Sequence, residues 1–165
     1  HQAVIESHLN WTLIHATGRS QWEEIKAHFE ANNIPVDSKN QRIVPYLEDM
    51  PELLHAADLV VSRAGALALA EIAACGLPAI LIPYPYAAEN HQEKNASTFV
   101  AVGAAAMLKD RELQEGVLLR QVEDILNTQG KLAIMGAAAK QLAKPKATEE
   151  IADLAIELLA KGDKI

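Results

Sequence analysis

The sequence predicts an α/β fold in which a parallel sheet is covered by helices on both faces. Short apolar runs alternate along the chain with longer segments whose apolar residues recur at helical spacing. The runs, such as "DLVVS" and "AILIP", are almost entirely apolar, which is typical of strands buried on both faces of a parallel sheet. Half of the 165 residues are hydrophobic and only 4% are aromatic, so we expect an aliphatic core.

The first third of the chain is expected to alternate helix and strand. Residues 2–9 have the pattern of the end of a helix, and Trp22, Ile25 and Phe29 share one face of a second helix. A polar loop is expected over residues 33–41. The predicted strands here are residues 11–15 and 42–46, and the predicted helices after residue 9 are 22–33 and 47–57.

The remainder of the chain continues the alternation. Gly76 and Pro78 together predict the end of an alanine-rich helix. The predicted strands are residues 59–62, 79–83 and 104–108, and the predicted helices are 66–75, 88–103, 111–127, 130–143 and 147–161. With right-handed crossovers this order gives a Rossmann-like domain, although the sequence does not set the order of strands in the sheet.

Composition limits the classes of function. A length of 165 residues favours one domain, and a net charge of −7 argues against binding nucleic acid or anionic lipid through charge alone. The single cysteine, Cys75, excludes a disulfide framework or a multi-cysteine metal site. No apolar run reaches the ~20 residues of a membrane span. Because the sequence opens on His1, we expect it to be part of a longer protein.

Ligands of such folds bind at the carboxyl ends of the strands, and the turn "SRAG" lies at one of them. Glycine at position 65 permits a positive φ and a close approach of a ligand to the backbone. The amides of Ala66 and Leu67 would then be unpaired helix N–H groups that suit an anion such as a diphosphate. The alternative is that Gly65 only forms the turn.

Glu71 is the one acid in the alanine-rich helix. It follows Leu67 by four residues, so the two share a face near the site end. A carboxylate can accept hydrogen bonds from both hydroxyls of a ribose, as acids do in this fold class. The alternative is a solvated Glu71 at the edge of the helix.

The loop and helix that follow the strand 79–83 offer several polar groups. Gln92 and Asn95 are three residues apart on one helical face, and an amide both donates and accepts, which suits sugar hydroxyls. His91 could bind a phosphate or a hydroxyl. Each of these residues could instead be a helix cap or a solvated position.

Two further turns contribute candidates. Tyr46 offers a ring to a base, and the backbone of Leu47 could pair with a pyrimidine edge, although both residues could simply belong to the core. Arg63 is a candidate phosphate partner, or an exposed turn arginine. His15 is interpreted as a hydrogen-bonded histidine at a strand end.

With these residues identified, the segment "ADLVVSRAGALALAEIAACGLPAILIPYPYAAENHQEKNA", preceded by "VPYLEDMPELLHA", resembles the carboxyl-terminal half of the MurG family of bacterial peptidoglycan glycosyltransferases. The resemblance is strong over about residues 42–108. Members of that family have two Rossmann-like domains, the GT-B arrangement, and the carboxyl-terminal domain holds the UDP-sugar. The resemblance therefore implies that residues 1–165 form a single UDP-sugar-binding domain.

The family's activity is an inverting transfer of GlcNAc from UDP-GlcNAc to undecaprenyl-pyrophosphoryl-MurNAc-pentapeptide, which converts lipid I to lipid II. By resemblance, Leu47 pairs with uracil beside Tyr46, and Glu71 binds the ribose hydroxyls. The hydroxyls of the GlcNAc would be hydrogen-bonded by His91, Gln92 and Asn95. The substrate-binding set implied is Tyr46, Leu47, Arg63, Gly65, Ala66, Leu67, Ala68, Leu69, Ala70, Glu71, His91, Gln92 and Asn95.

The resemblance also implies what lies elsewhere. The family's first strand, its glycine-rich loop and its amino-terminal domain are expected before residue 1. That domain would supply the catalytic base, the lipid I site and the contact with the cytoplasmic face of the membrane, so no catalytic residue is expected here and the chain alone is expected to be inactive. No metal, cofactor or nucleic acid is expected.

Three other functions stay open at this point. UDP-GlcNAc 2-epimerases share the two-domain architecture, so the protein could be an isomerase. It could also be a half-enzyme that binds a UDP-sugar and needs a membrane partner. The third is a plain structural α/β module.

Overall fold

The computed structural model describes residues 11–162, and the helix end expected over residues 2–9 lies outside the described residues. The chain divides between Met50 and Pro51 into two compact units, each described by itself. The elements are β1 (Leu13–Ala16), α2 (Trp22–Ala31), β2 (Asp37–Ser38), β3 (Gln41–Val44), α3 (Met50–Ala56), β4 (Val60–Ser62), α4 (Ala66–Cys75), β5 (Ala79–Leu81), η1 (Ala88–Asn90), α5 (His91–Ala101), β6 (Ala105–Met107), η2 (Asp110–Glu112), α6 (Val117–Asn127), α7 (Lys131–Gln141) and α8 (Ala147–Gly162).

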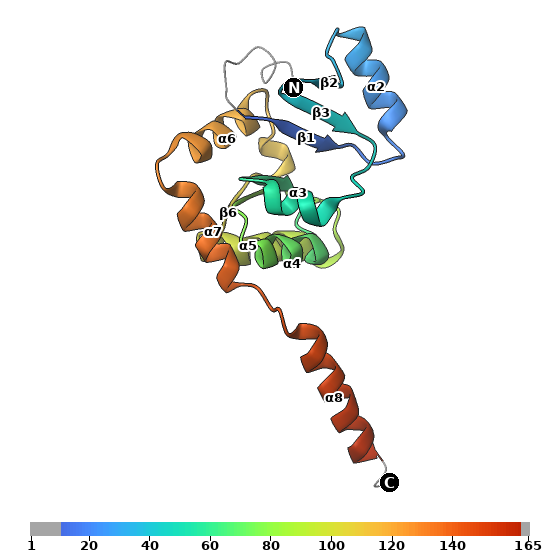
Figure 1. The fold of residues 1–165 in the computed structure, drawn as a ribbon, viewed down its shortest axis with the longest axis vertical. Helices are drawn as coiled ribbons and strands as arrows, with labels where there is room; N and C mark the ends of the chain where they lie inside the picture. Colours follow the sequence, from blue (N-terminus) through green and yellow to red (C-terminus); the bar gives the residue numbers. More distant parts are fainter. Residues whose placement is uncertain (1–10, 163–165) are drawn as a thin grey trace. The chain divides into compact units, whose positions relative to one another are not determined.

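The first unit holds a three-stranded sheet in the order β1–β3–β2, and Figure 1 shows α2 alongside it. β1 and β3 are parallel, with Leu13 opposite Gln41. The loop expected over residues 33–41 instead contains β2, which turns back on β3 as an antiparallel hairpin. Gln41 is fully buried and donates through Nε2 to the carbonyl of Pro35 at 2.8 Å, a bond that satisfies a buried amide beside this turn.

The second unit holds a wholly parallel sheet in the order β4–β5–β6. Alternate residues of the central strand enter two different cores, so both faces of the sheet are covered. Ala79 and Leu81 pack with α4 and α5, whereas Ile80 packs with Ile125 of α6 and Met135 of α7. The predicted parallel sheet with helices on both faces is therefore confirmed.

Helix α4 forms over the residues that the sequence predicts. Its alanines and leucines are strong helix formers, and Gly76 ends it at φ 68°, ψ 42°. There the N–H of Leu77 donates to the carbonyl of Ile72 at 3.0 Å, the bond of a Schellman end. The left-handed conformation explains why glycine occupies position 76.

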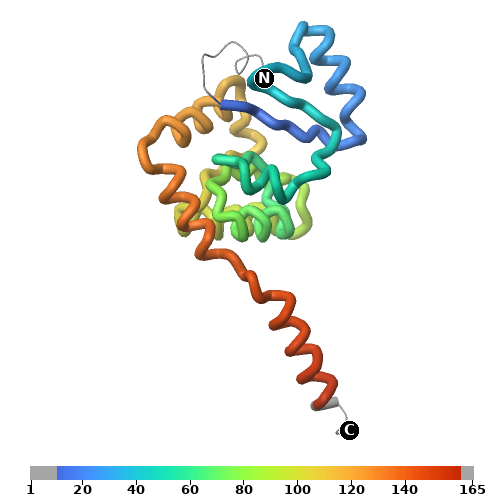
Figure 2. Tube along the Cα trace, viewed as in Figure 1, coloured from blue at the N-terminus to red at the C-terminus, as the bar shows by residue number. Residues whose placement is uncertain are grey.

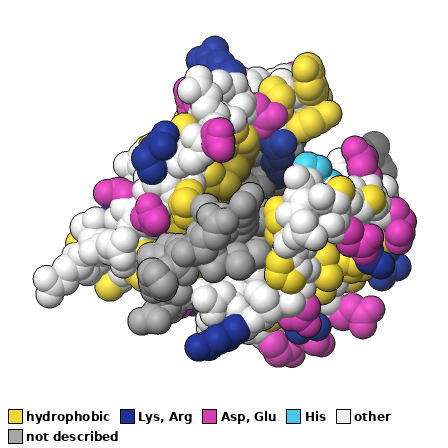
Figure 3. Space-filling view, turned by 90° about the horizontal axis from the view of Figure 1, so that it is seen from above, with side chains coloured by type: hydrophobic (Ala, Val, Ile, Leu, Met, Phe, Trp, Pro, Cys, Tyr) yellow, Lys and Arg dark blue, Asp and Glu magenta, His cyan; other side chains and the backbone are white. Residues whose placement is uncertain are grey.

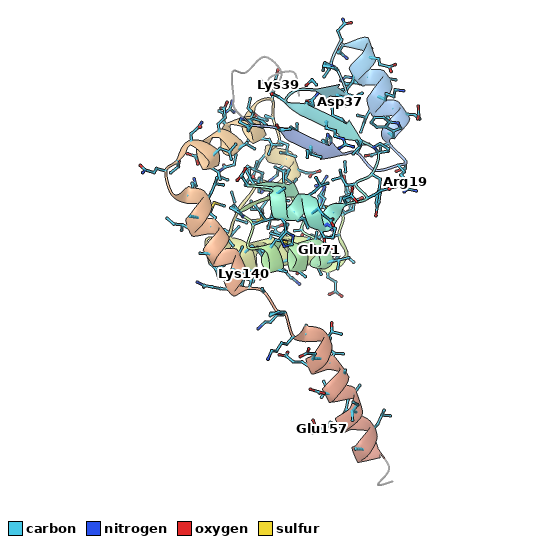
Figure 4. All side chains as sticks on the ribbon, viewed as in Figure 1. Arg19, Asp37, Lys39, Glu71, Lys140 and Glu157 are labelled. Carbon is cyan, nitrogen blue, oxygen red and sulfur yellow. The ribbon has the colours of Figure 1, made fainter. Side chains whose placement is uncertain are left out.

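Helices α4 and α7 pack unusually closely, and Figure 2 shows α7 returning beside α4. A Cβ added to Gly136 would lie 2.7 Å from the carbonyl oxygen of Gly76. Lys140, labelled on α7 in Figure 4, donates from Nζ to the carbonyl of Ala74. This bond satisfies one of the last carbonyls of α4, which have no partner within the helix.

The last helix, α8, exposes large apolar side chains. Its described side chains from residue 148 to residue 160 are all exposed, and they include Ile151, Leu154, Ile156, Leu158 and Leu159. Within residues 11–162, no helix is long and apolar enough to cross a membrane.

Candidate functional site

The three strands of the second unit end at one edge of their sheet. Ser62 pairs with Leu81, and Leu81 pairs with Met107, so the last residues of β4, β5 and β6 are register partners. The turns that follow these strands therefore leave the sheet side by side. This is the edge at which ligands bind in parallel α/β folds.

Helix α4 begins at this edge with open amides. Gly65 is its N-cap, and its carbonyl accepts from the N–H of Leu69 at 3.0 Å. Among the described residues, no group accepts a hydrogen bond from the N–H of Ala66, Leu67 or Ala68. The first turn carries no acidic side chain. Free amides and the positive end of the helix dipole together favour an anion here.

The backbone at Gly65 is extended. Its φ is −69° and its ψ is 144°, an extended conformation that any residue can adopt, so the turn does not use the positive φ that glycine permits. A Cβ added at Gly65 would meet nothing within 4 Å. The absence of a side chain at Gly65 therefore leaves open space beside the free amides, and the backbone conformation does not require glycine.

The exposed face of α4 carries Leu67 and Glu71. Leu67 is 76% exposed and Glu71, one turn further on, is exposed as well; Figure 4 labels Glu71 on this helix. Ala66 and Ala70 are also exposed, so small side chains surround this pair. Leu69 faces the other way, because it is 5% exposed and lies in the core.

Arg63, directly after β4, is held by several protein acceptors. Its Nη1 donates to the carbonyls of Ile82 and Pro83, at 3.2 Å each, and forms an ion pair with Asp110. Its guanidinium also lies 5.7 Å from the centre of the Tyr84 ring. Arg63 thus joins the turns that follow all three strands, with half of its side chain exposed.

The connection from β5 to α5 contains an unusual backbone. The single helix expected over residues 88–103 is broken, because Glu89 and Asn90, the last two residues of η1, adopt positive φ values of 50° and 56° directly before α5. Left-handed conformations are costly for residues with a Cβ. The His91 ring at the start of α5 bonds through Nδ1 to the carbonyl of Ala88 at 2.8 Å. A carbonyl can only accept, so Nδ1 carries a proton, and Nε2 has no bonding partner within the described residues.

The two amide side chains of α5 bond to backbone. Gln92 Oε1 accepts from the N–H of Ala64 at 3.2 Å and from the N–H of Tyr84 at 3.0 Å. Asn95 Nδ2 donates to the carbonyl of Ala64 at 3.2 Å. The structure therefore brings Gln92 and Asn95 to the turn that precedes Gly65.

An ion pair between α5 and the turn after β6 was not predicted from the sequence. Lys109, after β6, forms an ion pair with Glu93, which also accepts from Asn90 Nδ2 at 3.0 Å. The hydrogen bond from Lys109 lowers the pKa of Glu93, and that from Asn90 lowers it further. The sequence could have indicated this pair, because Lys109 and Asp110 directly follow the predicted strand 104–108, just as Arg63 follows the predicted strand 59–62.

Tyr46 and Leu47 belong to the first unit. Tyr46 is 56% exposed, and the guanidinium of Arg19 lies 4.8 Å from the centre of its ring, within the range of a cation–π contact. Leu47 is half-buried, and its backbone N–H and C=O have no bonding partner within the part of the chain that the structure describes. That backbone is free to pair with a ligand.

A separate hollow in the first unit contains none of the predicted site residues. It is lined by His15, Glu24, Ile25, His28 and Phe29. Burial lowers the pKa of His15 from its ordinary value. No group of three or more His, Cys, Asp or Glu side chains that could hold a metal ion occurs within residues 11–162.

Charge is mixed over the surface. Figure 3 shows acidic and basic side chains intermingled on the face in view. With a net charge of −7, attraction of an anion would have to be local, through the amides of α4 and single cations.

Comparison with known proteins places this geometry in a family. Residues 2–151 match the glycosyltransferase family 28 C-terminal domain. The chain is 44% identical over 140 residues to the UDP-N-acetylglucosamine--N-acetylmuramyl-(pentapeptide) pyrophosphoryl-undecaprenol N-acetylglucosamine transferase of Desulforamulus reducens, covering 84% of the chain and 38% of that protein. It is 40% identical over 162 residues to the enzyme of the same name from Desulforudis audaxviator, covering 98% of the chain and 43% of that protein.

A solved structure agrees. The crystal structure of MurG from Acinetobacter baumannii superimposes with a TM-score of 0.76 at 31% identity, over 92% of this chain and 43% of that one. The chain thus spans about two fifths of the length of these relatives. It has the fold of the carboxyl-terminal domain of a GT-B glycosyltransferase. The chain belongs to the glycosyltransferase family 28 C-terminal domain family.

Proposed function

We propose that this chain is the donor-binding half of an enzyme that moves GlcNAc from UDP-GlcNAc to undecaprenyl-pyrophosphoryl-MurNAc-pentapeptide, converting lipid I to lipid II in peptidoglycan synthesis. The observation that carries the proposal is the start of α4, where three free amides lie one turn from an exposed Glu71 at the carboxyl edge of a parallel sheet. The family match and the names of the relatives supply the substrates.

The donor's parts are assigned to groups of matching chemistry. The amides of Ala66, Leu67 and Ala68 bind the diphosphate, and the Glu71 carboxylate accepts from the ribose hydroxyls. The free backbone of Leu47, in the first unit, pairs with uracil beside Tyr46. This last assignment is supported by the family match, which runs across both units.

The sugar is assigned to the start of α5. His91 Nε2 and the polar groups of Gln92 and Asn95 that the backbone leaves free would bind hydroxyls of the GlcNAc. In an inverting transfer the acceptor 4-hydroxyl attacks the anomeric carbon, its proton passes to a base, and UDP leaves with the bonding electrons. The amides of α4 would stabilise the charge that develops on the departing diphosphate.

The remaining parts of the reaction are assigned outside residues 1–165. The catalytic base, the lipid acceptor site and the contact with the membrane would lie in the part of the relatives that this chain does not match. The enzyme would act as a peripheral protein on the cytoplasmic face of the bacterial membrane. An acceptor carrying an undecaprenyl chain requires contact with the membrane surface, because its lipid stays in the bilayer.

The proposal is tested by binding and by turnover. Calorimetric titration of the full-length protein should give heat with UDP-GlcNAc and none with ADP- or GDP-sugars at the same concentration. Supplied with a lipid-linked MurNAc-pentapeptide pyrophosphate, the protein should release UDP only when the acceptor is present. Release of free ManNAc or UDP-ManNAc without acceptor would instead identify an isomerase, and binding without either reaction would identify a half-enzyme that needs a partner.

A further inference from the structure

Ala64 has an unusual set of backbone partners. It lies just past the end of β4, where the sheet ladder makes its last bond from the N–H of Ile82 to the carbonyl of Ser62 at 2.8 Å. Ala64 is nevertheless fully buried, and a buried peptide needs partners for both of its polar groups. Side chains of α5 supply them: its N–H donates to Gln92 Oε1 and its carbonyl accepts from Asn95 Nδ2, each at 3.2 Å.

Gln92 also holds a second turn. The same Oε1 accepts from the N–H of Tyr84 at 3.0 Å. One oxygen atom therefore joins the turn after β4 to the turn after β5. Gln92 and Asn95 are three residues apart, so they project from one face of α5, and together they fix the peptide that immediately precedes the N-cap of α4.

The chemistry of these partners fixes the orientation of both amides. A backbone N–H can only donate and a backbone carbonyl can only accept, so Gln92 must present its oxygen and Asn95 its nitrogen. Both acceptor sites of Gln92 Oε1 are used, which leaves Nε2 as a donor only. Asn95 keeps its oxygen as an acceptor only. Neither free atom has a described partner.

We propose that Gln92 and Asn95 are positioning residues that set the place of the α4 amides through Ala64, in addition to any contact with the sugar. The inference rests on the proposed function, because it concerns the same diphosphate site. If α5 holds Ala64, then α5 determines where Gly65 and the free amides of Ala66 to Ala68 lie. Small displacements of such donors are costly, since binding and catalysis depend on their placement.

The two roles predict different losses. A residue that only reads GlcNAc affects UDP-GlcNAc and leaves the affinity for UDP unchanged. A residue that positions the α4 amides affects both ligands by the same factor, because both carry the diphosphate. Replacement of Gln92 by Met keeps the length of the side chain and removes the double acceptor, whereas replacement by Glu restores an acceptor and removes the Nε2 donor.

The experiment uses the full-length protein in three forms beside wild type: Gln92→Met, Gln92→Glu, and Lys94→Gln as a control at an exposed position of the same helix. Gln92→Met should weaken UDP by about tenfold or more, since two backbone donors lose their acceptor, and should weaken UDP-GlcNAc by at least the same factor, with any excess coming from a lost contact between Nε2 and the sugar. Gln92→Glu should return UDP affinity to within about threefold of wild type, with the residual loss coming from its negative charge. Lys94→Gln should change neither affinity.

Amide hydrogen exchange tests the contact without any ligand. The N–H groups of Ala64 and Tyr84 should exchange slowly in wild type and in Gln92→Glu, and faster in Gln92→Met, while the core amides of α4 keep their wild-type rates. An unchanged UDP affinity in Gln92→Met, or unchanged exchange at Ala64, would overturn the positioning role. Failure of the wild type to bind any uridine nucleotide would overturn the proposed function instead, and exchange at Ala64 would still decide whether Gln92 holds the turn.

Discussion

Gly65 occupies a position where its lack of a side chain matters more than its backbone freedom. Its φ of −69° suits any residue, and the space around its missing Cβ is empty. At Gly76 the φ is +68°, and a Cβ would come within 3.3 Å of Lys140. The same residue type therefore serves two different physical purposes at the two ends of α4.

These differences predict different behaviour for two alanine variants. Gly65→Ala should lower the free energy of unfolding by about 0.5–1 kcal/mol, because Gly65 is the N-cap of α4 and glycine is a better N-cap than alanine, and it should also weaken UDP binding because the new methyl group enters the anion's space. Gly76→Ala should lower stability by about 1–2 kcal/mol, the cost of a left-handed non-glycine residue. Chemical denaturation and calorimetry measure the two effects. A Gly65→Ala protein with wild-type UDP affinity would contradict this account of the anion site.

The Glu93–Lys109 pair predicts a dependence of stability on pH. The hydrogen bond from Lys109 lowers the pKa of Glu93 in the folded protein, so the pair stabilises the fold above the ordinary glutamate pKa. That stabilisation is lost as the pH falls through the lowered folded pKa. Glu93→Gln should therefore melt below wild type at pH 7, and the two melting temperatures should converge in acid. The exposed Glu115 provides a matched control, Glu115→Gln, which should follow wild type at every pH.

Residue types and spacing predicted that polar side chains lie at the carboxyl edge of the sheet. They did not predict the hydrogen-bond partners of these side chains. Arg63, Gln92 and Asn95 were all predicted at the edge where the strands end, and the structure places them there. Arg63 bonds to two carbonyls and Asp110, and the two amides bond to Ala64. Such partners come from turns distant in sequence, and no local pattern records them.

At the scale of elements, the prediction was most accurate where intrinsic preference and burial agree. Helix α4 has the predicted bounds because its composition favours a helix and Gly76 stops it. The prediction failed where tertiary contacts decide. β2 was expected as loop because its two residues are polar, and it forms by pairing with β3. The break before α5 requires left-handed Glu89 and Asn90, which carry no glycine signal.

The close packing of α4 and α7 predicts an unusual sign for a helix substitution. Gly→Ala within a helix normally stabilises by about 0.5–1 kcal/mol. At Gly136 the added Cβ would meet the carbonyl of Gly76 at 2.7 Å, so the helices must separate. We expect Gly136→Ala to destabilise by about 1–3 kcal/mol, the usual cost of overpacking. Urea denaturation measures this, and a stabilised variant would show that α7 can shift without cost.

At the scale of the whole molecule, the alternation of strands and helices predicted a parallel sheet covered on both faces, and the second unit confirms it. The division of the described chain into two compact units was not predicted. No glycine- or serine-rich linker marks the boundary between Met50 and Pro51 in the sequence. The chain carries a net charge of −7. A diphosphate would therefore bind through directed amides, and its affinity should depend less on salt than binding driven by a basic surface.

The most direct test of the account asks whether Glu71 binds ribose. Calorimetry should compare UDP with 2′-deoxy-UDP in wild type and in Glu71→Ala. Wild type should prefer UDP, and Glu71→Ala should lose about 1.5–3 kcal/mol of UDP affinity, the worth of hydrogen bonds to a charged group, together with the preference between the two nucleotides. An unchanged UDP affinity, or a ribose preference that survives in Glu71→Ala, would contradict the placement of the donor along α4.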